Sequence, residues 1–170
     1  MVLTVKHLNE LICSAISPEM AELNFWSIQE VSEGYEVILG DYSGSRGAWE
    51  QQGIVSRGTQ VMLGVYSHLD HGGWVFQGAN GFCSLKPNKP RVEDRGAGET
   101  RTIKYESPFH CQHSLFMPSY TPELWEQILG SNYNPELSQE QLWEVAGTLD
   151  LEVFLTEGAK KTVAIACQGF

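Results

Sequence analysis

The amino-acid sequence predicts an α+β fold, with a helical N-terminus, a β-rich middle and a C-terminal strand that leads into a helix. Three observations support this prediction. Apolar residues recur at helical spacing near both ends of the chain, glycines are frequent between residues 41 and 80, and short runs of β-branched and aromatic residues lie among those glycines. A change of character in the last third predicts two regions, residues 1–118 and residues 119–170.

Two helices are predicted before residue 25. Residues 7–15 place leucine, isoleucine and alanine side chains at helical spacing. The second helix starts after Ser17, because a capping hydroxyl is followed by Pro18 at the first helical position and by acidic residues in the first turn. This helix ends near Asn24, and a short strand over residues 35–39 follows between two glycines.

The middle of the chain predicts short strands separated by loops. Pro87 and Pro90 should end one of these strands, because proline cannot donate a ladder hydrogen bond. We expect residues 92–99 to form a mobile loop, because this stretch is polar and contains glycine. The predicted strands and extended segments cover residues 61–66, 74–77, 82–85, 102–106 and 114–117.

The last third predicts two helices, then a strand that leads into a third helix. The first helix starts at Thr121, where a capping residue precedes a proline and a glutamate. The second starts at Ser138, which has Gln141 three positions later, as in a capping box. Apolar and β-branched residues then predict a strand over residues 151–156 and a helix over residues 159–168.

Composition narrows the class of protein. The chain has 170 residues, 42% of them hydrophobic, which is enough for a buried core. No apolar run reaches the roughly 18 residues of a membrane helix, and the N-terminus does not have the pattern of a secretory signal. Four widely spaced cysteines are typical of reduced thiols in the cytoplasm. The net charge of -10 argues against general nucleic-acid binding, because each phosphate contact needs a positive partner.

The basic residues are concentrated in one stretch. Six of the eleven lie between residues 86 and 104, where only three acids accompany them, so the stretch carries about +3. It is either a solvated basic loop or a segment that contacts phosphates. Nearby aromatic side chains would either stack on bases or belong to the core. The six residues are Lys86, Lys89, Arg91, Arg95, Arg101 and Lys104.

A second candidate site lies where the last predicted strand meets the last helix. Glu157 would stand at the carboxyl end of a buried strand, the edge at which parallel α/β sheets bind ligands. A carboxylate there suits acid or base chemistry or a divalent metal. Lys160 and Lys161, in the first turn of the helix, could reach a phosphate. Alternatively, Glu157 only ends a strand and both lysines are solvated.

A set of histidines and cysteines is a further candidate. Zinc needs about four such ligands, but the spacing here fits no standard finger and contains no Cys-x-x-Cys pair. Hydrogen-bonded histidines and buried thiols are the alternative. The set comprises His68, His71, Cys83, His110, Cys111 and His113.

The run EGAKKTVAIACQGF, from Glu157 to Phe170, resembles a segment of large cyanobacterial plasmid replication proteins, in which it belongs to a TOPRIM-like domain. Four earlier segments resemble the same family in the same order. The resemblance implies the amino-terminal part of a plasmid replication protein, ending inside the TOPRIM-like domain. These segments are SPEMAELNFWSI, HGGWVFQG, LKPNKPR and KYESP.

The resemblance implies a role in plasmid DNA replication, with DNA, including single-stranded DNA, and other parts of the replication machinery as partners, and no membrane. Glu157 matches the acid/base glutamate of TOPRIM domains and would help to hold Mg²⁺. The Asp-x-Asp pair that normally completes the metal site is absent, so we expect this chain alone to be inactive and Mg²⁺ to bind only in a complete domain. The expected nucleic-acid contacts are Lys86, Lys89, Arg91, Arg101, Lys104, Lys160 and Lys161. The alternative is a non-catalytic scaffold or interaction domain whose acidic surface meets a protein.

Overall fold

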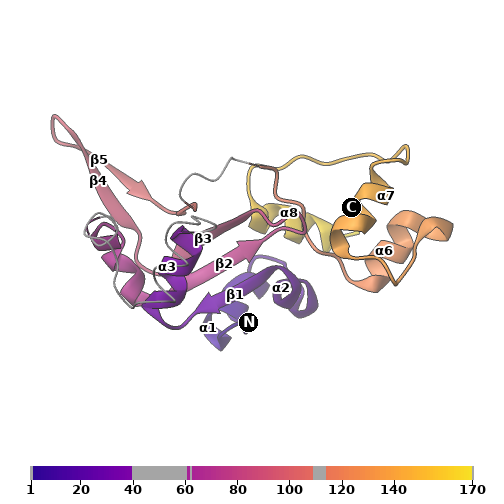
Figure 1. The fold of residues 1–170 in the computed structure, drawn as a ribbon, viewed down its shortest axis with the longest axis horizontal. Coiled ribbons are helices and arrows are strands. Elements are labelled where there is room, and N and C mark those ends of the chain that lie inside the picture. The colour runs from indigo at the N-terminus through magenta and orange to yellow at the C-terminus, as the bar shows by residue number, and fades with distance from the viewer. Residues whose placement is uncertain (1, 40–60, 62, 109–113, 170) are drawn as a thin grey trace, which may run out of the picture. The chain divides into compact units, whose positions relative to one another are not determined.

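The structure, a computed structural model, describes residues 2–39, 61, 63–108 and 114–169 (Figure 1). Helices and small antiparallel sheets make up this part of the chain, which confirms the predicted α+β class. The chain forms two units, each assembled from segments that are distant in the sequence. Unit 1 comprises residues 1–26, 76–82 and 114–170, and unit 2 comprises residues 27–75 and 83–113.

Two capped helices begin unit 1, α1 over Val5–Ile12 and α2 over Pro18–Asn24. The Ser17 hydroxyl accepts a hydrogen bond from the Met20 amide at 3.3 Å. The predicted cap and the predicted second helix are therefore confirmed. α1 starts two residues earlier than predicted, because the Thr4 side chain supplies a cap that the apolar pattern does not reveal.

The C-terminal part of unit 1 is helical. It contains α6 (Pro122–Leu129), the short 3-10 helix η2 (Gly130–Asn132), α7 (Gln139–Ala146) and α8 (Ala159–Ala166). α6 and α7 begin at the predicted caps, and the predicted capping box at the start of α7 is present in both directions. The predicted terminal helix is confirmed as α8, which ends two residues earlier than expected.

A three-stranded sheet has the order β1-β2-β3, with β1 at Phe25–Ile28, β2 at Gly73–Gln77 and β3 at Cys83–Pro87. The boundary between the units passes through β1 and β2. Gly73 allows β2 to come close to β3, because a Cβ atom there would lie 2.4 Å from the Lys86 carbonyl oxygen. The strands predicted near residues 74 and 82 are confirmed.

Unit 2 also contains α3 (Val31–Leu39), the 3-10 helix η1 (Ser67–His71), β4 (Arg91–Gly96) and β5 (Glu99–Ile103). β4 and β5 pair as an antiparallel hairpin. The prediction of a mobile loop over residues 92–99 was therefore wrong. Gly96, Ala97 and Gly98 all have positive φ, so the glycines that indicated a loop form only the tight turn between two strands.

Two predicted strands are helical instead. Residues 35–39 belong to α3, because the Glu33 carboxylate accepts hydrogen bonds from the Gln29 and Glu30 amides and so caps the start of a helix. Residues 61, 63 and 64 are also helical. Short apolar runs such as these fit a helix and a strand equally well, so periodicity alone could not distinguish them.

Two further predicted strands, residues 114–117 and 151–155, have no strand structure. The second correction affects the expected strand-to-helix unit, of which only the helix α8 is present. A strand needs a neighbour to satisfy its backbone groups, and no described strand pairs with residues 151–155. The expected buried strand is instead an exposed apolar segment.

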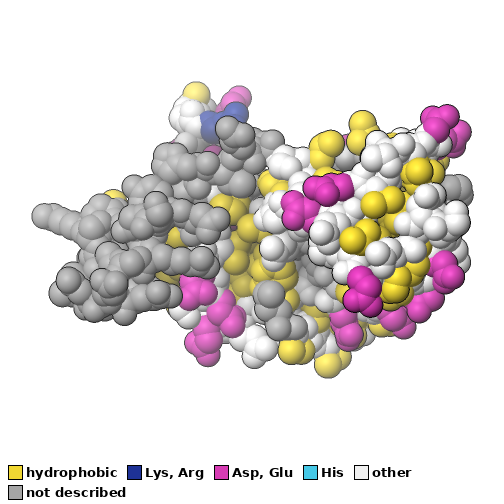
Figure 2. Space-filling view, turned by 45° about the vertical axis from the view of Figure 1, so that its right-hand side comes forward, with side chains coloured by type: hydrophobic (Ala, Val, Ile, Leu, Met, Phe, Trp, Pro, Cys, Tyr) yellow, Lys and Arg dark blue, Asp and Glu magenta, His cyan; other side chains and the backbone are white. Residues whose placement is uncertain are grey.

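The two units differ in charge. Unit 1 carries eleven Asp and Glu residues but only three Lys and Arg residues, whereas unit 2 carries ten and eight. Figure 2 shows acidic side chains scattered among apolar ones on the face presented there. In the described part of the chain, no helix has both the length and the apolar character needed to cross a membrane.

Candidate functional site

The β4–β5 hairpin is the most exposed regular element of unit 2. Glu93 lies opposite Arg101 and Val92 lies opposite Thr102, and the register shifts after Asp94, close to the turn. All residues of the ribbon except Arg91, Glu93 and Ile103 are exposed. Figure 1 shows the hairpin as a two-stranded arm that projects from the rest of its unit. Its side chains are therefore available to a ligand.

Three cations on or beside this hairpin have no fixed partner. Arg95, Arg101 and Lys104 are exposed, and no hydrogen bond or ion pair holds their side chains to another described residue. Arg101 and Lys104 were predicted as nucleic-acid contacts, whereas Arg95 was only counted in the basic stretch. Along the hairpin, Arg95 lies near the turn, Arg101 lies opposite Glu93, and Lys104 follows the end of β5. The sequence could not show this placement while residues 92–99 were predicted to be a loop.

The other predicted basic contacts in this unit have partners within the protein. Lys86 Nζ lies 5.3 Å from the centroid of the Trp74 ring, and Lys89 Nζ lies 3.5 Å from His71 Nε2. Trp74 is only 1% exposed, so it belongs to the core and offers no stacking surface for a base. Tyr105 is 45% exposed, and its ring meets that of Trp74 edge to face at 6.1 Å.

Arg91 holds the base of the hairpin through a buried ion pair. Its Nε lies 2.6 Å from Glu106 Oε1 and its Nη2 lies 3.2 Å from Oε2, while Nη1 bonds Glu93. Glu106 is 3% exposed, and the Tyr66 ring lies 5.4 Å from the Arg91 guanidinium carbon. Hydrogen bonding to Glu106 raises the pKa of Arg91. This arrangement uses the guanidinium structurally and leaves it less available to a phosphate than the three free cations.

His68 completes this buried cluster from η1. Its Nε2 lies 3.3 Å from Glu106 Oε1, yet neither ring nitrogen has a hydrogen bond of good geometry in the described part of the chain. Burial lowers the pKa of His68, and the charge of Glu106 opposes this effect while that of Arg91 adds to it. Sequence reasoning grouped His68 with possible zinc ligands, but residues 110–113, which include three of that set, lie outside the described residues.

His68 should make the stability of unit 2 fall in mild acid. Its pKa is lower in the folded than in the unfolded chain, so the unfolded chain binds the proton first and stability is lost as the pH falls below about 6.5. We expect His68→Phe to lose less stability than the wild type between pH 7.5 and pH 5.5, in urea unfolding followed by fluorescence. The exposed His71→Phe is the matched control. Equal losses in wild type and His68→Phe would contradict the prediction.

Glu157 and the two lysines of α8 are only partly brought together. Glu157 forms an ion pair with Lys161 one turn later, and both side chains are exposed. Lys160 instead points to α1, where its Nζ lies 3.3 Å from Glu10 Oε1. Hydrogen bonding to Lys161 lowers the pKa of Glu157. A general acid or base near neutral pH needs the opposite shift, so this geometry offers no support for that role.

The described residues do not fit the Mg²⁺ site that the resemblance implies. No three His, Cys, Asp or Glu side chains among them are placed to hold one metal ion. Glu157 is a single exposed carboxylate whose charge is already matched by Lys161. Magnesium retains most of its water and is held by several oxygens around a site, so one such carboxylate would bind it weakly.

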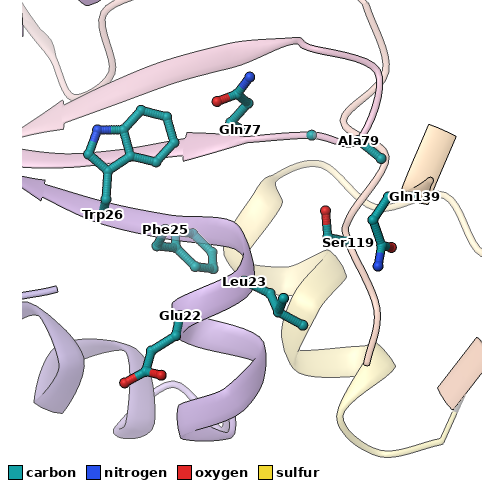
Figure 3. A pocket seen from close by; sticks show the side chains of 9 residues that line it. Glu22, Leu23, Phe25, Trp26, Gln77, Ala79, Ser119 and Gln139 are labelled. Atoms are coloured by element: carbon teal, nitrogen blue, oxygen red, sulfur yellow. The ribbon is translucent and has the colours of Figure 1, made fainter. Parts of the chain in front are cut away.

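Unit 1 contains a pocket of about 300 Å³ that sequence reasoning did not find. Figure 3 shows Leu23, Phe25 and Trp26 on one side of it and Ser119 and Gln139 on the other. The side-chain amide of Gln139 already has hydrogen-bond partners within the protein. Its Oε1 accepts from the Tyr120 amide and the Trp125 indole, and its Nε2 donates to the Tyr120 carbonyl. No sequence motif indicates the pocket, because its walls come from four separate segments of the unit.

Comparison with known proteins gives one informative match. The chain is 30% identical over 167 residues to an uncharacterized protein of Picosynechococcus sp. (strain PCC 7002), and the match covers 92% of this chain but 16% of that protein. The chain thus spans about a sixth of the length of the relative it matches. No family model matches the chain, and no solved structure matches it.

Proposed function

We propose that this chain is a DNA-binding part of a longer cytoplasmic replication protein, and that the β4–β5 hairpin contacts the DNA backbone. The observation that carries the proposal is the exposed arm with three cations, Arg95, Arg101 and Lys104, that no described residue neutralises. Two-stranded ribbons fit into a DNA groove, and guanidinium groups suit phosphates. The match to a much longer cyanobacterial protein supports only the part of the proposal that concerns a longer protein. The sequence resemblance to plasmid replication proteins is what favours replication.

Binding through this arm should be weak and sensitive to salt. Three phosphate contacts to a single strand give a slope of about -2 in log K against log salt, or about a twentyfold loss between 50 and 200 mM salt. The acidity of unit 1, with eleven acids against three bases, would add repulsion at low salt. Contacts outside the hairpin would make the measured slope steeper.

Removing the three free cations should abolish most of this affinity. We expect Arg95→Ala/Arg101→Ala/Lys104→Ala to bind a fluorescein-labelled oligothymidylate at least about tenfold more weakly at low salt, with a salt slope reduced by about 2. Fluorescence anisotropy across a salt series measures both. A duplex of equal length shows whether single strands are preferred.

The matched control changes the same arm without changing its charge. Thr100→Ala/Thr102→Ala alters two exposed β5 side chains and should bind as the wild type does. Lys160→Ala/Lys161→Ala tests the predicted contacts on α8, which the ion pairs with Glu10 and Glu157 already occupy. If the wild type binds and the triple variant binds equally well, the hairpin is not the contact.

A scaffold function is the second candidate, favoured by the charge of unit 1. From residue 114 to residue 159, within unit 1, the sequence contains eight acidic residues and no lysine or arginine. Such a surface suits a basic protein partner better than a nucleic acid. Absence of DNA binding at low salt would favour this function. A contribution of Glu157 to Mg²⁺-dependent phosphoryl transfer would need further carboxylates from elsewhere in a longer protein.

A further inference from the structure

The turn that follows β2 contains the one Asn-Gly pair of the sequence, Asn80-Gly81. An asparagine before a glycine is the pair most prone to deamidation, because glycine has no side chain to keep its backbone nitrogen away from the asparagine side chain. Gly81 has a φ of 78°, and a Cβ atom there would meet nothing within 4 Å. The backbone of the turn, and not crowding, therefore requires the glycine.

The side chain of Asn80 ties this turn to residues 114–115, and both parts belong to unit 1. Its Nδ2 donates to Ser114 Oγ and to the Leu115 carbonyl oxygen, each at 2.8 Å. Its Oδ1 accepts a hydrogen bond from the Phe82 amide at 3.4 Å. One amide group thus joins two segments that are more than thirty positions apart in the sequence.

The folded turn engages the groups that deamidation needs. In this reaction the Gly81 nitrogen attacks Cγ of Asn80, the bond from Cγ to Nδ2 breaks, and ammonia leaves with the proton of the Gly81 amide. Water then opens the cyclic imide at either carbonyl and gives aspartate or isoaspartate. In the structure the Gly81 amide donates to the Gly78 carbonyl oxygen at 2.9 Å, and Nδ2 is held by two acceptors. The closed turn therefore opposes the attack, and the reaction requires the turn to open.

We propose that Asn80 is a site of spontaneous deamidation that the fold slows, and that the reaction loosens the turn and releases residues 114–115. This inference concerns unit 1 and does not depend on DNA binding. A carboxylate has no proton to donate to the Leu115 carbonyl oxygen, so an attraction at that atom would become a repulsion. Isoaspartate would also lengthen the backbone between the Gly78 amide and the Phe82 carbonyl oxygen, which close the turn with a bond of 2.7 Å.

Peptide mass spectrometry of the whole 170-residue chain, aged at mildly alkaline pH with and without concentrated urea, tests whether the site reacts. We expect the peptide with Asn80 to deamidate in urea, and to do so at least about tenfold more slowly in the folded chain. Asn134 is the internal control, because Pro135 has no amide proton and cannot form the imide. Equal rates with and without urea, or no deamidation in urea, would overturn the proposal.

Hydrogen exchange over residues 78–82 tests the consequence of the reaction. We expect Asn80→Asp to exchange there about two- to tenfold faster than the wild type, the effect of losing one hydrogen bond. Asn134→Asp is the matched control, because it adds the same charge to unit 1 but keeps the oxygen that accepts from the Glu136 amide. The deamidated wild type, separated by anion exchange, gives the same measurement if Asn80→Asp does not fold. Exchange as slow as in the wild type, or equal acceleration by Asn134→Asp, would overturn the proposal.

Discussion

Replacing Arg91 with methionine is expected to lower the free energy of unfolding of unit 2 by about 3–5 kcal/mol at pH 7, because a buried carboxylate would lose its partner. Glu106 is 3% exposed and receives two bonds from the Arg91 guanidinium. Methionine keeps much of the side-chain volume, so the loss reports the charge and not a cavity. Urea unfolding, followed by circular dichroism and fluorescence, measures the change.

The stability lost in Arg91→Met should become smaller as the pH falls. A loss caused by poorer packing would not depend on pH, so the pH series distinguishes the two causes. Without Arg91, the charge of the buried Glu106 carboxylate would be unpaired, and an unpaired buried charge is costly unless it is neutralised. We expect Glu106→Gln to lower the free energy of unfolding less than Arg91→Met does. In Glu106→Gln the remaining charge is that of Arg91, whose side chain is 20% exposed and still forms an ion pair with Glu93. The double variant Arg91→Met/Glu106→Leu should cost less than Arg91→Met alone. A pH-independent loss in Arg91→Met would contradict this account.

The helix starts were predictable from the sequence because their causes are local. Ser17, Thr121 and Ser138 each cap a helix whose first turn carries a proline or an acid, and each side chain makes the bond its spacing indicates. α3 also starts from a local contact, but Glu33 caps it from inside the helix, which is not the usual N-terminal pattern. Without a recognised cap, the spacing of apolar residues did not distinguish a helix from a strand over residues 35–39.

The hairpin and its buried base depend on contacts that are remote in the sequence. Arg91 meets Glu106 across fifteen positions, and His68 reaches the same carboxylate from an element far earlier in the chain. Sequence reasoning located the basic stretch but predicted the same availability for Arg91 and Arg101. The structure shows that Arg91 is bound by Glu106 and Glu93, whereas Arg101 on β5 has no partner among the described residues. The strand predicted over residues 151–155 also depended on a remote contact, because a strand needs a neighbouring strand, and no described strand pairs with these residues.

Trp125→Ala is expected to lower the free energy of unfolding of unit 1 by about 3–5 kcal/mol, the range for removing a fully buried large aromatic side chain. Trp125 is 1% exposed, and its ring meets Tyr120 at 5.0 Å and Trp143 at 5.4 Å, both edge to face. Its indole nitrogen donates to Gln139 Oε1 at 2.7 Å. Burial in this cluster also raises the pKa of Tyr120 to about 12.

Trp125→Phe separates the ring contacts from the hydrogen bond. Phenylalanine keeps an aromatic ring against Tyr120 and Trp143, and Gln139 Oε1 keeps the Tyr120 amide as a donor, so no buried acceptor is orphaned. Its cost should therefore be well below that of Trp125→Ala. Leu115→Ala, at a site that is 69% exposed, is the control and should change stability by less than about 0.5 kcal/mol. Truncating a well-packed core tryptophan leaves a cavity that its neighbours fill only in part. A loss below about 1 kcal/mol in Trp125→Ala would therefore contradict the prediction and would mean that the packing of α6 and α7 does not depend on this aromatic cluster.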